Sequence, residues 1–97
     1  MTKAWLELDQ FAPYLEQDFI AGPEPTAPVL TLIEAEPLRN HGVATRAPFA
    51  LLFRSNHTPM LEQGQYRLTH AVAGTHDIFL VPVGRNDGGI LYEAIFN

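Results

Sequence analysis

Hydrophobic and polar side chains alternate along most of the chain after residue 28, which is the pattern of half-buried β-strands. Turn-forming proline, glycine and asparagine residues separate the segments that show this pattern. These segments cover residues 29–36, 49–54, 63–70, 77–83 and 90–96. Short connections favour antiparallel neighbours. The pattern therefore predicts an all-β domain with a minor helical part, an antiparallel meander of five or six strands curled into a small barrel or sandwich.

The first part of the chain follows a helical pattern instead. Leu8, Phe11 and Leu15 recur at helical spacing with polar residues between them, and Pro13 interrupts the run. We expect a short N-terminal helix, or two broken turns, across residues 6–17 that plugs or caps the barrel. The segment 22–28 contains three prolines and is predicted to be a loop.

Two of the predicted strands, residues 49–53 and 78–83, are apolar on both faces. The side chains opposite the main core face are Ala50, Leu52, Phe79 and Val81. In a domain built from one sheet, this second face must be covered by the helix, by a second layer or by another protein. Packing within the chain is the commoner explanation, and an interface is the alternative. Pro82 marks an edge or a bulge.

Composition and charge narrow the class of protein. The 97 residues make one compact domain, and the net charge of −5 disfavours binding to nucleic acid or to an anionic membrane surface. There is no cysteine, and no apolar stretch approaches the roughly 20 residues of a membrane helix. The N-terminus does not have the pattern of a signal peptide, so we expect a cytoplasmic location.

Glu93 is predicted to form a cross-strand ion pair with Arg54 or Arg67.

His70 and Asp77 are the best candidates for a catalytic polar pair. A two-residue turn at Ala73 and Gly74 would place them directly opposite each other, where an imidazole–carboxylate hydrogen bond can form. A hydrolytic triad would also need a nucleophile, which would have to be Ser55, the only serine, or a threonine. The sequence around Ser55 does not resemble a strained nucleophile turn. A charge-neutralising pair at a hairpin end is therefore the favoured interpretation, and the chain is not expected to be an enzyme.

The four histidines are the candidate metal ligands of the chain. His41, His70 and His76 would gather with Asp77 at one end of a meander, and His57 would lie at the other. No short ligand spacing is present, so solvated loop histidines are favoured and neither a metal nor a cofactor is predicted. Residues 84–89 lack the lysine and the following helix of a phosphate loop and are predicted to form a turn.

Aromatic residues suggest two further sites. Near the N-terminus these are Trp5, Phe11, Tyr14 and Phe19. They are predicted to seal the end of the core, with a partner-binding anchor as the alternative. The second site is a cavity inside a ligand-binding barrel, and its candidate lining residues are Tyr66, Leu68, Phe79 and Tyr92.

Four strings of residues carry a resemblance to a known family. They are PFALLFR at 48–54, QGQYRLTH at 63–70, FLVPVG at 79–84 and YEAIFN at 92–97, preceded by FAPYL at 11–15. In this order they resemble a family of small bacterial proteins of unknown function. The resemblance covers nearly the whole chain and implies an association with phage-tail-like collar proteins, but it implies no catalytic residue.

Three functions are compatible with these observations. The leading hypothesis is a non-enzymatic structural or protein-interaction module, an accessory of a phage-tail-like assembly, that binds a protein partner or self-associates. A small-ligand-binding β-barrel is the alternative, and a His/Asp or metal-assisted hydrolase ranks third because so small a domain has few residues to spare for a deep active site.

Overall fold

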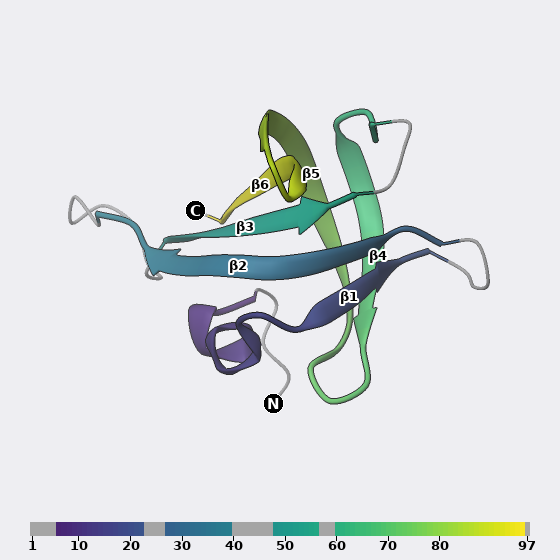
Figure 1. Cartoon of the computed structure of the whole chain (residues 1–97). Helices are drawn as coiled ribbons and strands as arrows, with labels where there is room; N and C mark the ends of the chain where they lie inside the picture. Colours follow the sequence, from purple (N-terminus) through teal and green to yellow (C-terminus); the bar gives the residue numbers. More distant parts are fainter. Residues whose placement is uncertain (1–5, 23–26, 40–47, 57–59, 97) are drawn as a thin grey trace.

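Six antiparallel strands close into a ring in the computed structural model, which describes residues 6–22, 27–39, 48–56 and 60–96 (Figure 1). The strands are β1 (Asp18–Ala21), β2 (Val29–Pro37), β3 (Phe49–Ser55), β4 (Gly64–His70), β5 (Gly74–Asn86) and β6 (Gly89–Phe96). The order around the ring is β1-β2-β3-β6-β5-β4, and β4 pairs with β1 to close it. The predicted all-β class is confirmed, and the strands form one closed sheet rather than a sandwich of two.

The chain builds this ring as two three-stranded meanders. The first contains β1, β2 and β3, and the second contains β4, β5 and β6. The two halves join where β3 pairs with β6 and where β1 pairs with β4. A single continuous meander would have placed β4 beside β3. β5 is long enough to pair first with β4 and then with β6.

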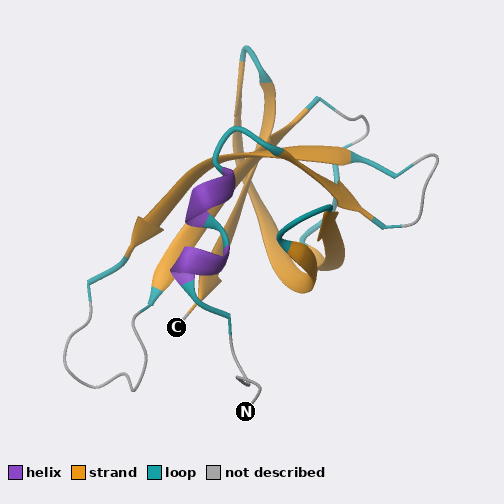
Figure 2. Ribbon diagram, turned by 90° about the horizontal axis from the view of Figure 1, so that it is seen from below, coloured by secondary structure: helices purple, strands orange, loops and turns teal. Residues whose placement is uncertain are grey.

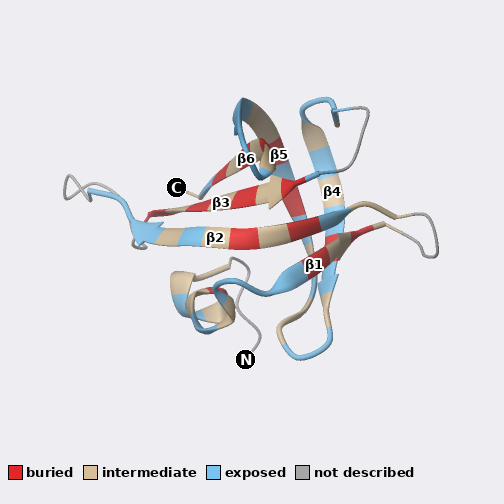
Figure 3. Cartoon of the chain, viewed as in Figure 1, coloured by how far each residue is buried: buried red, intermediate tan, exposed pale blue. Residues whose placement is uncertain are grey.

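Buried residues alternate with more exposed ones along β3 and β6 (Figure 3), so one set of side chains lies inside the ring. Phe49, Leu51 and Phe53 of β3 are buried as predicted, and they face Leu68 of β4, Ile78 and Leu80 of β5 and Tyr92 of β6 within one hydrophobic core. In β4 the polar residues at 65, 67 and 69 point outward and are exposed. The period-2 pattern of the sequence therefore identified the inward face correctly.

Two irregularities bend the strands. The pairing of β5 with β6 shifts between Pro82 and Gly84, and the pairing of β2 with β3 shifts between Leu32 and Glu34. Proline has no backbone N–H to donate to a neighbouring strand. At a bulge the regular ladder of hydrogen bonds is already interrupted, so Pro82 can lie there without costing the sheet a hydrogen bond. The predicted bulge is confirmed, and such bulges increase the local bend that a small closed sheet needs.

Two consecutive 3₁₀ turns, η1 (Leu8–Gln10) and η2 (Ala12–Tyr14), form the N-terminal segment (Figure 2). Phe11 lies between them and is fully buried. Its ring centroid lies 6.4 Å from that of Phe19, 6.2 Å from that of Phe49, 6.1 Å from that of Phe96 and 5.2 Å from that of His76. Because these neighbours come from β1, β3, β6 and β5, Phe11 closes one end of the ring. The prediction of two broken turns that cap the sheet is confirmed.

The turn between β5 and β6 depends on a glycine. Gly89 has φ +134°, and a Cβ at this position would collide with the backbone carbonyl oxygen of Ser55 at the end of β3. Only glycine therefore lets β6 approach β3 this closely.

No helix within the described residues has the length and apolar character needed to cross a bilayer.

Candidate functional site

The register of the β4–β5 hairpin separates the predicted polar pair. His70 lies opposite Gly74, and Asp77 lies opposite Arg67. Three residues, 71–73, connect the strands, so the predicted two-residue turn is wrong. Residues that lie opposite each other in an antiparallel pair share a face, and side chains alternate between faces along each strand. Asp77, opposite the exposed Arg67, therefore points outward, whereas His70, two residues from the buried Leu68, points inward. Gly74 supplies the positive φ of +93° with which this longer loop ends.

His70 holds the hairpin loop through its imidazole ring. Its Nδ1 accepts hydrogen bonds from the backbone N–H groups of Val72 and Ala73, both at 3.0 Å. Nδ1 therefore carries no proton, and the proton on Nε2 is donated to Oε1 of Gln17 at 2.6 Å. Asp77 lies on the opposite face of the hairpin from His70, so these two residues do not form the imidazole–carboxylate half of a hydrolytic triad.

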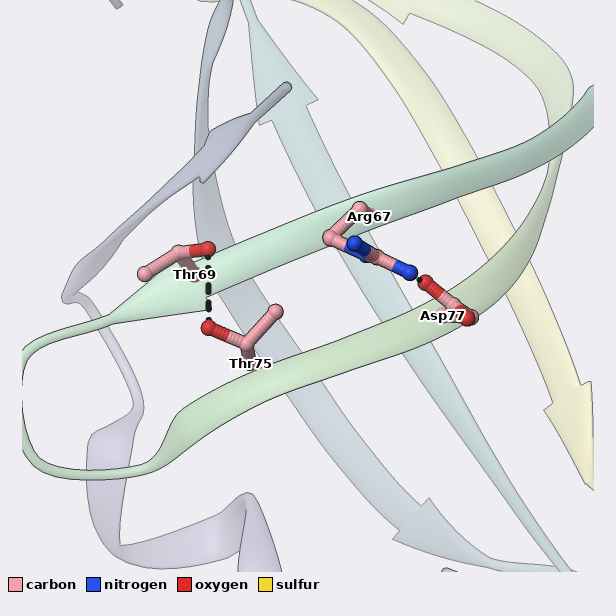
Figure 4. Close-up of polar contacts among 4 residues, drawn as sticks. All are labelled: Arg67, Thr69, Thr75 and Asp77. Carbon is pink, nitrogen blue, oxygen red and sulfur yellow. Dashed lines mark hydrogen bonds and ion pairs between the residues drawn. The ribbon is translucent and has the colours of Figure 1, made fainter. Parts of the chain in front are cut away.

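The outward face of the hairpin carries a ladder of polar pairs (Figure 4). Arg67 donates from Nε to Oδ1 of Asp77 at 3.0 Å, and the hydroxyls of Thr69 and Thr75 lie 3.1 Å apart. The hydrogen bond to Asp77, together with the charge of that carboxylate, raises the pKa of Arg67. A shallow recess of about 570 Å³ runs beside this ladder. Its charged lining residues already satisfy each other, which leaves little for a ligand to pair with.

The other residues that the sequence suggested for a metal site do not form one among the described residues. His76 donates from Nε2 to the carbonyl of Ala73 at 2.8 Å and packs against Phe11. His41 and His57 lie outside the described residues, and among the residues that are described no three His, Asp or Glu side chains are grouped to hold a metal ion. The turn predicted for residues 84–89 is shorter in the structure: residues 87 and 88 form it, whereas residues 84–86 belong to β5 and Gly89 begins β6. The N–H of Gly88 donates to Oδ1 of Asn86 at 2.8 Å.

The candidate cavity residues mostly belong to the packed core. Leu68 and Tyr92 are fully buried, and the Tyr92 hydroxyl accepts a hydrogen bond from the backbone N–H of Leu61 at 2.9 Å. Tyr66 is half-buried and donates its hydroxyl to the carbonyl of Glu62 at 2.6 Å. Phe79 points outward. Three of these side chains therefore pack in or against the core, and the fourth, Phe79, lies outside it.

The candidate interface residues separate into two groups. Near the N-terminus, Phe11 is part of the core and offers no surface to a partner, because it fills the end of the ring. Tyr14 is half-buried, with its ring 4.8 Å from that of His70. Trp5 lies outside the described residues. The prediction that aromatic residues seal this end of the core is confirmed for Phe11 and Phe19.

The second group forms one apolar outer face on β3, β6 and β5. We define this apolar outer face as Ala50, Leu52, Phe79, Val81 and Ile95. Leu52 and Val81 each lie opposite Glu93, Ala50 lies opposite Ile95, and Phe79 is two residues from Val81 on the same strand. Phe79 is 51% exposed and Ile95 is 47% exposed. Ile95 was missed as an interface residue, although the alternation in residues 90–96 places it on the outer side.

Glu93 lies within this face without the ion pair that the sequence predicted. Its direct neighbours across the sheet are Leu52 and Val81. Arg54 lies opposite Thr31 and Leu91 instead, and Arg67 pairs with Asp77. Within the described residues, the half-buried carboxylate of Glu93 has neither a hydrogen bond nor an ion pair. Its direct cross-strand neighbours are apolar, and the side chain of Arg54, two residues from Leu52 on the same face, extends toward Gly88.

The fold and these surfaces together define a small all-β domain, a plugged six-stranded ring with an apolar patch on its outer side. A model of the family described as "Domain of unknown function (DUF6916)" matches residues 6–96, and the chain belongs to this family. This agrees with the resemblance to a family of unknown function that the sequence motifs carry. Neither a curated protein nor a solved structure matches the chain.

Proposed function

We propose that this chain is a non-enzymatic protein-interaction module whose docking surface is the apolar outer face. The observation that carries the proposal is the exposure of Phe79 and Ile95 beside Leu52 and Val81 on adjacent strands. Scattered single apolar side chains are normal on a protein surface, but a contiguous set on one sheet face is typical of an interaction site. Aromatic residues at the centre of such patches often contribute much of the binding energy.

The closed ring restricts how a partner binds. Each of the six strands has a neighbour on both sides, but β1 pairs with only part of β2 and of β4, so an added strand could pair only with the stretches that β1 leaves uncovered. The apolar outer face lies on β3, β5 and β6, away from those stretches, so a partner that binds there contacts side chains. Side-chain recognition of this kind depends on apolar anchors, which the apolar outer face supplies.

The state of the polar side chains supports a role without catalysis. Both ring nitrogens of His70 are used within the described structure, and Arg67 and Asp77 are paired with each other. A catalytic site needs a base or nucleophile with its reactive atom directed at a substrate. The resemblance of the sequence motifs to a bacterial family associated with collar proteins favours a partner within a phage-tail-like assembly.

Site-specific photo-crosslinking in native cells tests the proposal. A photoreactive phenylalanine analogue is placed at position 79 or 95, and the control position is Val72, which is 73% exposed at the hairpin loop. We expect a discrete crosslinked protein from positions 79 and 95 and none from position 72. Equal crosslinking from all three positions, or none from positions 79 and 95, would overturn the proposal.

A further inference from the structure

We infer that the partner inserts an arginine or lysine between apolar side chains, and that Glu93 is the residue that recognises this cation. This inference rests on the proposed function, because it specifies the chemistry of the partner that the apolar outer face receives. The observation behind it is a carboxylate set among apolar side chains rather than at the margin of the patch.

A partner that docks on this face must remove water from the Glu93 carboxylate, which costs free energy. Leu52 on β3 and Val81 on β5 flank it directly, and Ile95 lies two residues along β6. A partner that covers these three side chains must also remove water from the carboxylate. Burying an unpaired carboxylate is strongly unfavourable, so a partner that binds here needs a positive group at this point.

Two further acidic residues, at the edge of the apolar outer face next to β2, also favour a partner with positive charge. Glu34 and Glu36 of β2 lie opposite Leu52 and Ala50 respectively, and both are exposed on the β2 side of the face. Arg54 lies on the same outer face, two residues from Leu52 and opposite Leu91, but its Cδ and Nε lie beside Gly88, so its side chain extends toward the turn between β5 and β6. The face is therefore apolar at its centre and acidic along one side, which is complementary to apolar side chains accompanied by basic ones.

A second copy of the chain does not meet this requirement. A symmetric dimer places the same patch of both copies against each other, so two Glu93 carboxylates would approach within one apolar contact. The chain also has a net charge of −5, which adds repulsion between copies. A different protein with an exposed arginine or lysine is the occupant that the charge distribution fits. Arginine suits the site best, because its planar guanidinium pairs with a carboxylate through two hydrogen bonds.

The test repeats the crosslinking from position 79 with the full chain carrying Glu93→Gln. Glutamine keeps the size of the side chain and removes its charge. Glu62→Gln is the matched control, because Glu62 is exposed, lies outside the apolar outer face and changes the net charge by the same amount. We expect the Glu93→Gln variant to require at least about tenfold more partner for half-maximal crosslinking, and Glu62→Gln to behave like the wild type. The crosslinked peptide should contain a basic residue next to apolar ones.

The outcomes separate the inference from the proposed function. If position 79 crosslinks a partner equally well in the wild-type chain and in the Glu93→Gln variant, a docking surface exists but the cation does not contribute, and the inference is overturned. A crosslink to a second copy of this chain also overturns it. If position 79 crosslinks nothing, the proposed function fails and the inference fails with it.

Discussion

Truncation of Phe11 to alanine tests whether the N-terminal turns are part of the core or an appendage to it. Phe11 is fully buried and contacts aromatic rings from four strands around the end of the ring. Replacing such a phenylalanine removes its transfer free energy and leaves a cavity, which together cost about 3–5 kcal/mol. A domain of this size has a free energy of unfolding of about 5–15 kcal/mol. The substitution should therefore remove about a fifth or more of the total free energy of unfolding, and most of it if that total lies near the lower end of the range.

Urea titration followed by far-UV circular dichroism measures this loss. Leu15→Ala is the matched control, because Leu15 lies in the same segment but is 42% exposed, and we expect it to cost less than about 1 kcal/mol. A loss of less than about 1 kcal/mol in the free energy of unfolding of Phe11→Ala would contradict a core role for this side chain. That result would mean that the ring holds its end closed without the aromatic plug.

Three other substitutions test particular features. Gly89→Ala should cost about 2–3 kcal/mol in a urea titration, because its φ is positive and its Cβ would meet the β3 backbone, whereas Gly84→Ala, which has open space, should change little. A small effect at Gly89 would contradict the close approach of the strands. Tyr92→Phe should cost about 1–3 kcal/mol by leaving the N–H of Leu61 without its acceptor, and a neutral result would show that water replaces the hydroxyl. Glu93→Leu should promote self-association in sedimentation velocity by removing the like charge at the centre of the apolar outer face, and an unchanged monomer would argue against that repulsion.

The strands were largely predictable because one face of each is buried. Alternation identified β2, β3, β4 and β6, and in β3 it also separated the inward from the outward side chains. Pro82 was predicted to mark an edge or a bulge, and a bulge lies beside it in β5. β1 was not predicted as a separate strand, since its four residues are too few to show a period. The pairing of β3 with β6 was also out of reach, because local turns specify pairs within each meander and say nothing about how two meanders meet.

The candidate site was predictable in part for the same reason. Leu52, Phe79 and Val81 were recognised as facing away from the core, since both faces of their strands are apolar. The His70–Asp77 pair failed because its register rested on a two-residue turn. Three loop residues replace that turn, and the imidazole accepts two of their N–H groups, a role more familiar from asparagine and aspartate side chains. Glu93 was predicted to pair with an arginine, and only the strand order shows that its neighbours are apolar.

The place of β6 in the ring has a consequence for how the domain folds during synthesis. β6 is the last of the six strands to be made, yet it lies between β3 and β5. At about 5–20 residues per second, the 41 residues from the end of β3 at Ser55 to Phe96 take roughly 2–8 s to appear. During that interval the doubly apolar β3 has one edge without a partner, a condition that favours aggregation of the nascent chain. A chaperone that shields β3, or delivery of the chain to its partner only after release from the ribosome, would protect the domain at this stage.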